Sequence, residues 1–423
     1  QVVLKQGAWV TRYDWYNGVY WTSFDVMNKE KPRDEEDRRM TMLTYRTDAP
    51  QESVTYFGWS WLYPKTKTFS DLTGDVSILT SVIPKVFKDT DPLYMYAVQR
   101  WDANELTLKA EEQFEFDHPQ TPVYTGVLEN GDFAAVFAPM GGPGTKKTAD
   151  PNPLNWTYVQ ANSFTCEIVA RKSFTSPASY WDIHQITLLE DGDIYIYGEA
   201  SDKSNDKYYN LQIGKSKATG FILAKVVDGE TKFVNMTALE EFEQKLKAPP
   251  SQKKAVAYKG KRFQLGGIQE LSNGDIMISG QNYKDKESGR QFLDVMVFHF
   301  NGKGELKAQY GLDVEEKNKW AKSVFTESLF WETPNGKEAF WIIMEVAGMK
   351  SGMFKETRAL NYARVGKVDL DASTVGDFVS LGQEKGNTFY LENSFPILPL
   401  NEENKIVFFG SDKGGRVLWF ARM

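Results

Sequence analysis

The sequence is poor in the residues that most often carry metal or thiol chemistry. Its 423 residues include one cysteine, Cys166, and three histidines, His118, His184 and His299. One cysteine cannot form an intramolecular disulfide, and no cysteine or histidine pair has the spacing of a zinc site. We therefore expect no metal site, and we expect Cys166 to be a small buried apolar residue.

Long apolar runs and an excess of basic charge are also missing. No run of about 18 apolar residues occurs, so we expect no transmembrane segment. The net charge of −7 argues against nucleic acid as a partner, because phosphate binding needs clustered basic side chains. The chain begins at Gln1 rather than methionine, which fits a removed export signal. We accordingly expect a secreted, periplasmic or cell-surface protein.

Catalytic and nucleotide-binding motifs are absent as well. The sequence has no G-x-S-x-G, H-E-x-x-H, Walker or Rossmann motif and no repeated calcium-binding loop. The glycine-rich stretch 141–144 lacks the spacing of a phosphate-binding loop, and its proline-rich continuation predicts no helix. The sequence thus predicts no cofactor and identifies no reaction.

What the sequence does contain is a repeated hairpin. Short turns of the Asn-Gly-Asp or Asp-Gly-Asp type lie between apolar runs rich in β-branched and aromatic residues. Asn-Gly and Asp-Gly accept the positive φ that a tight hairpin turn requires. The clear copies turn at 130–132, 191–193 and 273–275, and weaker copies turn at 74–75, 335–336 and 403–404.

A second hairpin follows in several of the repeats, as in 93–111, 220–235 and 292–309. One unit is therefore four antiparallel strands, recurring at intervals of roughly 60 to 80 residues. This pattern predicts an all-β fold, a single β-propeller domain over residues 1–423 with six or seven four-stranded antiparallel blades. We expect the N-terminal run Val2–Leu4 to pair with the C-terminal strand and close the ring, and residues 9–63 to form a seventh blade or an extension.

In these turns the whole chain resembles secreted bacterial β-propellers that carry an Asn/Asp-Gly-Asp hairpin in each blade. The resemblance implies the ring-shaped fold and export. It implies no particular activity, because propellers host unrelated functions.

One segment is predicted to be helical, as an insertion around 237–247. Thr237 and Glu240 have the spacing of a capping box, and Pro249-Pro250 would end the helix.

Loop lengths predict where a ligand binds. In a four-stranded antiparallel unit the first and third connections lie at one end, and the second connection and the links between units lie at the other. The first connections are tight turns, whereas the second connections and links are long, as in 139–155, 199–219, 235–262 and 281–291. We expect the loop-rich face to bind a glycan or a protein ligand.

Four residues near this face are candidates for chemistry. Trp181, Asp182 and His184 lie where a link leads into a strand, and Glu199 ends the next strand. They could form an acid/base pair beside an aromatic wall, or a two-carboxylate site of the kind glycoside hydrolases use. Alternatively, Asp182 caps the strand and His184 bonds to the backbone.

The N-terminal region is rich in aromatic residues, including Trp59 and Trp61. Alternation places these two tryptophans on one side of a strand. They would either stack on sugar rings or fill the space between blades.

These observations leave three functional hypotheses open. The first is a non-catalytic, monomeric ligand-binding or interaction protein of the bacterial envelope. The second is a carbohydrate-active enzyme, a glycoside hydrolase or lyase, with carboxylates at the mouth of the central channel. The third is a structural module of an assembly.

Overall fold

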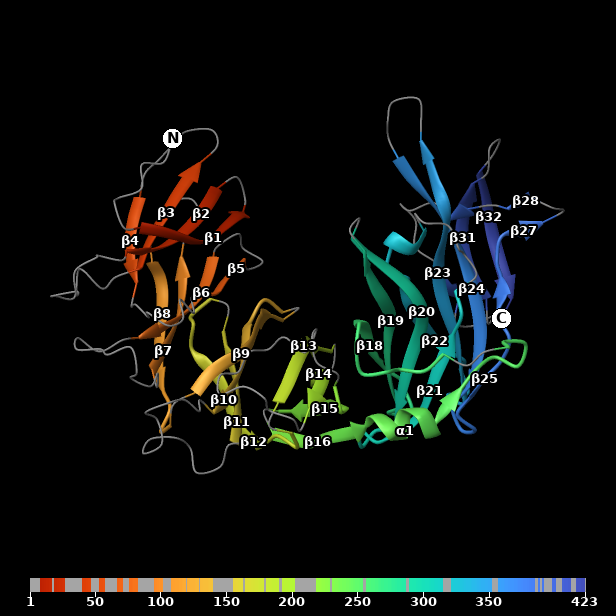
Figure 1. Ribbon diagram of the computed structural model, residues 1–423, viewed down its shortest axis with the longest axis horizontal. Coiled ribbons are helices and arrows are strands. Elements are labelled where there is room, and N and C mark those ends of the chain that lie inside the picture. Colours follow the sequence, from red (N-terminus) through yellow and green to blue (C-terminus); the bar gives the residue numbers. More distant parts are fainter. Residues whose placement is uncertain are drawn as a thin grey trace. The chain divides into compact units, whose positions relative to one another are not determined.

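The computed structural model places strands along the entire chain (Figure 1). The residues that the structure describes are 8–16, 19–26, 40–46, 53–57, 67–70, 76–82, 95–101, 108–118, 120–128, 130–139, 155–162, 164–178, 180–189, 192–201, 218–228, 230–253, 256–286, 289–314, 321–351, 357–384, 387–388, 390–391, 398–400, 405–411 and 416–422.

The chain divides into two compact units. The first comprises residues 1–197, 202–211 and 224–234, and the second comprises 198–201, 212–223 and 235–423.

Four four-stranded sheets follow one another from the N-terminus, each with its strands in consecutive order. The first two contain β1 (Ala8–Tyr16), β2 (Val19–Val26), β3 (Met40–Arg46) and β4 (Ser53–Phe57), then β5 (Lys67–Ser70), β6 (Val76–Val82), β7 (Met95–Trp101) and β8 (Leu108–Glu115). The next two contain β9 (Gln120–Val127), β10 (Phe133–Pro139), β11 (Asn155–Ala161) and β12 (Ile168–Thr175), then β13 (Tyr180–Leu188), β14 (Ile194–Ser201), β15 (Gly220–Val227) and β16 (Glu230–Ala238).

The fifth sheet repeats this plan and adds a short parallel strand at its edge, in the order β17-β21-β20-β19-β18. Its strands are β17 (Leu246–Lys247), β18 (Phe263–Glu270), β19 (Ile276–Lys286), β20 (Gly289–Phe300) and β21 (Leu306–Leu312). A 3-10 helix, η4 (Ala321–Ser323), leads into the C-terminal sheets.

The C-terminal part departs from four consecutive strands. The main sheet has the order β22-β23-β24-β29-β31-β30, with β25 and β26 on β24 and β32 on β31, and β27 pairs with β28. The strands are β22 (Ser328–Glu332), β23 (Glu338–Ser351), β24 (Thr357–Asp369), β25 (Thr374–Val375), β26 (Val379–Ser380), β27 (Gln383–Glu384), β28 (Asn387–Thr388), β29 (Tyr390–Leu391), β30 (Leu398–Leu400), β31 (Lys405–Ser411) and β32 (Arg416–Arg422).

The strand pairing confirms the all-β prediction and all six repeated hairpins. Within the region 9–63, the described strands β1–β4 pair as one antiparallel sheet. Ring closure, the number of blades and the single domain stay predictions. The proposed closing run Val2–Leu4 lies outside the described residues.

The repeated turn has one geometry in its clear copies. Gly131, Gly192 and Gly274 have φ of 90°, 90° and 81°, which is the left-handed conformation that glycine adopts readily. The asparagine before each of two of these glycines accepts a bond from the backbone N–H of the following aspartate. These bonds measure 3.1 Å at Asn130 and 2.9 Å at Asn273. The Asn-Gly-Asp pattern is therefore a local device that closes the hairpin.

The aspartate of each clear copy also bonds to the third strand of its sheet. The partners are a glutamine, a lysine and a histidine, in the pairs Asp132–Gln160 at 2.8 Å, Asp193–Lys225 at 2.6 Å and Asp275–His299 at 2.8 Å. The aspartate of the motif thus connects the turn, which lies between the first and second strands, to the third strand of the same sheet.

A helix, α1, occurs within the predicted insertion but spans only Leu239–Gln244. The predicted capping box is wrong, because Thr237 belongs to β16 and Ala238 is the N-cap, with no side-chain cap bond. The N–H of Leu239 instead donates to the carbonyl of Thr219, at 3.0 Å. A tertiary backbone bond therefore takes the place of the local cap.

Buried aromatic side chains make up much of the core. Phe298 packs against Phe221, Phe242 and Phe263, with ring centroids 5.4, 4.6 and 5.3 Å away. Trp156, Trp181 and Trp341 are fully buried. Cys166 is buried, as expected, and its Sγ donates to the carbonyl of Ala110 at 3.7 Å.

Candidate functional site

The end of the β18–β21 sheet opposite the turn at 273–275, which we call the loop end, contains a small cavity, the β18 cavity. The long connection predicted over 281–291 is wrong, because β19 runs to Lys286 and β20 begins at Gly289. The cavity lies where the link after α1 meets the beginning of β18, the end of β19 and the beginning of β20. Antiparallel pairing places these three strand ends together, opposite the turn at 273–275. The cavity therefore lies at the end of its sheet where the loop lengths predicted a ligand site.

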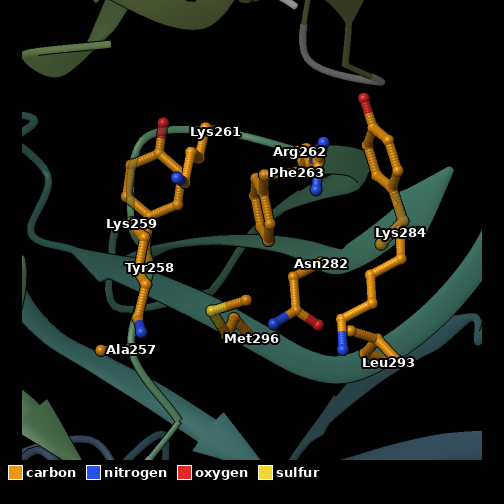
Figure 2. Close-up of a pocket in the computed structure, with 11 residues that line it drawn as sticks. Ala257, Tyr258, Lys259, Lys261, Arg262, Phe263, Asn282, Lys284, Leu293 and Met296 are labelled. Carbon is orange, nitrogen blue, oxygen red and sulfur yellow. The ribbon is translucent and has the colours of Figure 1, made fainter. Parts of the chain in front are cut away.

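The cavity has a volume of about 180 Å³ and combines an apolar floor with a basic rim (Figure 2). Phe263, Leu293 and Met296 supply the apolar surface. In Figure 2, Lys261 and Lys284 lie on opposite sides of the Phe263 ring. A ligand at this site would meet an aromatic face between cationic groups.

The link is held firmly on β21. The N–H of Tyr258 donates to Oε1 of Gln309 at 3.2 Å, and Nε2 of Gln309 donates to the carbonyl of Val256 at 3.1 Å. Gly311 permits this crossing, because a Cβ at that position would lie 2.0 Å from the carbonyl oxygen of Val256. The wall of the cavity is thus a fixed segment of chain.

Tyr258 also connects the cavity to one of the residues selected from the sequence, Glu199. The hydroxyl of Tyr258 donates to Oε1 of Glu199 at 2.5 Å. Burial, followed by the charge of Glu199, raises the pKa of Tyr258 well above its ordinary value. The phenol therefore stays protonated and remains a donor to the carboxylate.

Two further bonds fix the opposite side of the cavity. Arg262 has a φ of 52°, and its carbonyl accepts a bond from the N–H of Tyr283 at 2.9 Å. Oδ1 of Asn282 accepts from the N–H of Asp294 at 2.6 Å. These bonds hold the link against β19 and hold β19 against β20.

The charge at the rim has one sign. Lys259, Lys261, Arg262 and Lys284 are exposed lining residues, and none of the described lining residues is a carboxylate. The nearby acidic groups have other partners. Asp294 bonds to Asn282, and Asp285 lies 3.9 Å from Arg290.

The candidates on β13 occupy different environments. Trp181 is fully buried, with its ring centroid 5.7 Å from that of Trp156. Asp182 is partly buried, and this burial raises its pKa to about 6. His184 is exposed, with its ring 6.0 Å from that of Tyr197. The binding or catalytic roles of these residues stay predictions.

The other selected residues lie elsewhere. Glu199 accepts a hydrogen bond from the hydroxyl of Tyr258, and its binding or catalytic role stays a prediction. Trp59 and Trp61 are outside the described residues.

Sequence reasoning missed the basic rim. The run Lys259-Gly260-Lys261-Arg262 immediately precedes the apolar strand β18 and would have been the signal. The convergence of Leu293 and Met296 on the same cavity depends on the pairing of β19 with β20, which the sequence does not specify.

Within the described ranges, no cluster of three or more His, Cys, Asp or Glu side chains is arranged to hold a metal ion. The described helices include none long and apolar enough to span a membrane.

No protein-family model matches the chain, and no curated protein matches it. Among solved structures it is similar to Kuenenia stuttgartiensis hydrazine synthase, with a TM-score of 0.32, 8% identity, and coverage of 96% of this chain and 92% of the other. It is also similar to the Hadza microbial sialidase Hz136, with a TM-score of 0.30, 11% identity, and coverage of 96% of this chain and 76% of the other. A third similar structure is the WD40 domain of SCAP from fission yeast, with a TM-score of 0.26, 10% identity, and coverage of 98% of this chain and 92% of the other. Similarity at this level does not assign the chain to a family.

Proposed function

We propose that the protein is a non-catalytic binding protein and that the β18 cavity is its ligand site. The observation that carries this proposal is the composition of the cavity, whose described lining residues are apolar, polar or cationic and include no carboxylate for acid/base work. Binding residues on loops that a rigid sheet supports are a common arrangement.

A glycan is the ligand class that we favour. Sugar rings present C–H faces that pack on aromatic side chains. The aromatic side chains that line the cavity include Phe263, which is 8% exposed, and the partly buried Tyr283, whose ring centroid lies 3.9 Å from the guanidinium of Arg290. A glycan ligand would also suit a protein of the cell envelope, which is the location that we propose from the sequence.

A carbohydrate-active enzyme is the second candidate, and one observation favours it. Asp182, with a pKa of about 6, could carry a proton near neutral pH, as a general acid must. Its carboxylate partner would still have to be found, since glycoside hydrolysis uses two carboxyl groups.

A glycan array, followed by calorimetry on the strongest ligand, tests the binding function. Leu293→Trp would fill the cavity, and Val379→Trp adds the same side chain at a site that is 61% exposed. We expect Leu293→Trp to weaken binding at least about tenfold and Val379→Trp to leave it unchanged. Absence of any glycan binding, or equal affinities in the two variants, would contradict the proposal.

Release of reducing sugar from the bound glycan tests the enzymatic alternative. Turnover by the native protein that disappears in Asp182→Asn would establish catalysis and reject the non-catalytic function. Binding without turnover would support our proposal.

A further inference from the structure

The rim of the β18 cavity draws its cations from two separate segments. Lys259, Lys261 and Arg262 belong to the link, and Lys284 lies near the end of β19. Bonds from Gln309 to the link and from Tyr283 to the carbonyl of Arg262 hold the two segments together. The charges therefore converge because the backbone fixes them, in a chain whose net charge is −7.

No carboxylate of the described chain forms a salt bridge with these four side chains. The nearest acidic groups bond elsewhere, Glu199 to Tyr258, Asp294 to Asn282 and Asp285 to Arg290. Like charges that face a common space repel one another, and a bound anion would relieve that repulsion. The guanidinium of Arg262 also suits bidentate recognition of a carboxylate or phosphate.

The size of the cavity limits what it can hold. A volume of about 180 Å³ is below the range of roughly 300–1,000 Å³ that drug-sized ligands occupy. One sugar unit with an anionic substituent is of a suitable scale. Its ring would lie against Leu293 and Tyr283, the partly exposed apolar and aromatic side chains of the lining, while its charge faces the rim.

From this geometry we propose that the β18 cavity binds a single anionic sugar unit, with its charged group held by Arg262 and Lys284. This inference rests on the proposed function and specifies its ligand class. The anionic group is a carboxylate of a uronic acid or a phosphate on the sugar, since the rim would recognise either.

Titration calorimetry with glucuronate, glucose 6-phosphate and glucose tests the charge requirement. We expect at least one of the anionic sugars to bind about tenfold or more tightly than glucose. The anion that binds more tightly distinguishes carboxylate from phosphate recognition. Equal affinity for glucose and both anions would overturn this inference while leaving the proposed function intact.

Variants that remove the charge of a side chain but keep its length test whether Arg262 and Lys284 cause the preference for an anionic sugar. Arg262→Gln combined with Lys284→Gln should reduce the preference for the anionic sugar to about twofold or less. Lys337→Gln, at an exposed position in the turn before β23, is the matched control and should keep the preference. A preference that survives the double substitution would overturn the assignment to this rim.

Two further ligands test whether a sugar is required. Inorganic sulfate should bind more weakly than the anionic sugar, because it cannot use the apolar floor. An acidic peptide should also bind more weakly than the sugar. Equal or tighter binding of either probe would overturn the saccharide assignment. If no probe binds and Leu293→Trp changes nothing on the glycan array, the proposed function fails as well.

Discussion

The two ends of the β18–β21 sheet use charged residues in opposite ways. At the turn end, the carboxylate of Asp275 is buried and bonds to His299 and Lys307. At the loop end, Lys261 and Lys284 are exposed around a cavity whose described lining includes no carboxylate. The comparison indicates that the first end stabilises the fold, whereas the second leaves charge available to a ligand.

The bonds at the turn end determine the protonation of His299. Oδ2 of Asp275 lies 2.8 Å from Nε2 of His299, and an ionised carboxylate can only accept a hydrogen bond. Nε2 therefore carries the hydrogen. Nδ1 then accepts from the hydroxyl of Tyr310 at 2.8 Å, and Lys307 balances the negative charge at 2.9 Å. The network is satisfied with a neutral imidazole.

Removing the carboxylate should have the largest effect on stability. Asp275→Ala leaves His299 and Lys307 without their shared acceptor, and we expect the free energy of unfolding to fall by about 3 kcal/mol. Urea denaturation measures this change. Asp285→Ala is the matched control at the loop end, where the carboxylate is exposed and pairs loosely with Arg290. Equal losses in the two variants would show that the two ends do not differ.

Acidification should also reduce the stability that this network provides. Between about pH 7.5 and 5.5, where only His299 of the network titrates, the loss of stability should be smaller than that caused by Asp275→Ala. Burial lowers the pKa of His299, although Asp275 opposes this shift. Burial alone would raise the pKa of Asp275, but the bonds from His299 and Lys307 outweigh it and hold that pKa below its ordinary value.

Both groups have a lower pKa in the folded state, so each contributes stability above its unfolded pKa and loses it as the pH falls. The loss begins near the ordinary histidine pKa of 6.5 and continues through the carboxylate range below 3.8. Urea denaturation between about pH 7.5 and 5.5 should show stability falling less steeply in His299→Gln than in the native protein. A parallel pH dependence in the two proteins would exclude His299 as the cause.

Removing the aspartate of the corresponding turn in the β9–β12 sheet should reduce stability less than Asp275→Ala does. Asp132 accepts from Gln160, a neutral side chain, at 2.8 Å. Asp132→Ala removes the acceptor of two neutral amides, Gln160 and Asn130, and we expect a loss of about 1 kcal/mol in the free energy of unfolding. The ratio of this loss to that of Asp275→Ala, measured under the same conditions, tests whether the charged partner makes the difference. Losses of the same size would show that it does not.

The structure of the turn end could be predicted from the sequence better than the structure of the loop end. The conformations of Gly131 and Gly274 and the asparagine bonds beside them are local, so a three-residue pattern indicates them. The third-strand partners Gln160 and His299 are not local, because they depend on the register between strands. For the same reason the long link 235–262 pointed to one end of the sheet, but not to the residues that line the β18 cavity there.

The start of the helix α1 is a second feature that the local sequence did not predict correctly. The local spacing of Thr237 and Glu240 favours a capping box, yet pairing in the sheet extends β16 through Ala238. At Glu199, the sequence suggested one member of a two-carboxylate site near the loop-rich face. The link instead brings Tyr258 onto it from 59 positions away in the chain. Tertiary contacts determine both outcomes.

The smallest effect on stability should come from the rim of the β18 cavity. Lys261→Ala and Lys284→Ala remove exposed cations that form no salt bridge within the described chain, so the free energy of unfolding should change by no more than about 0.5 kcal/mol. At low salt a slight gain in stability is expected, because each substitution relieves repulsion between like charges, and added salt should remove the gain. Thermal denaturation at two salt concentrations measures both. A loss above about 1 kcal/mol would mean that these lysines stabilise the fold, as Lys307 does at the other end of the sheet.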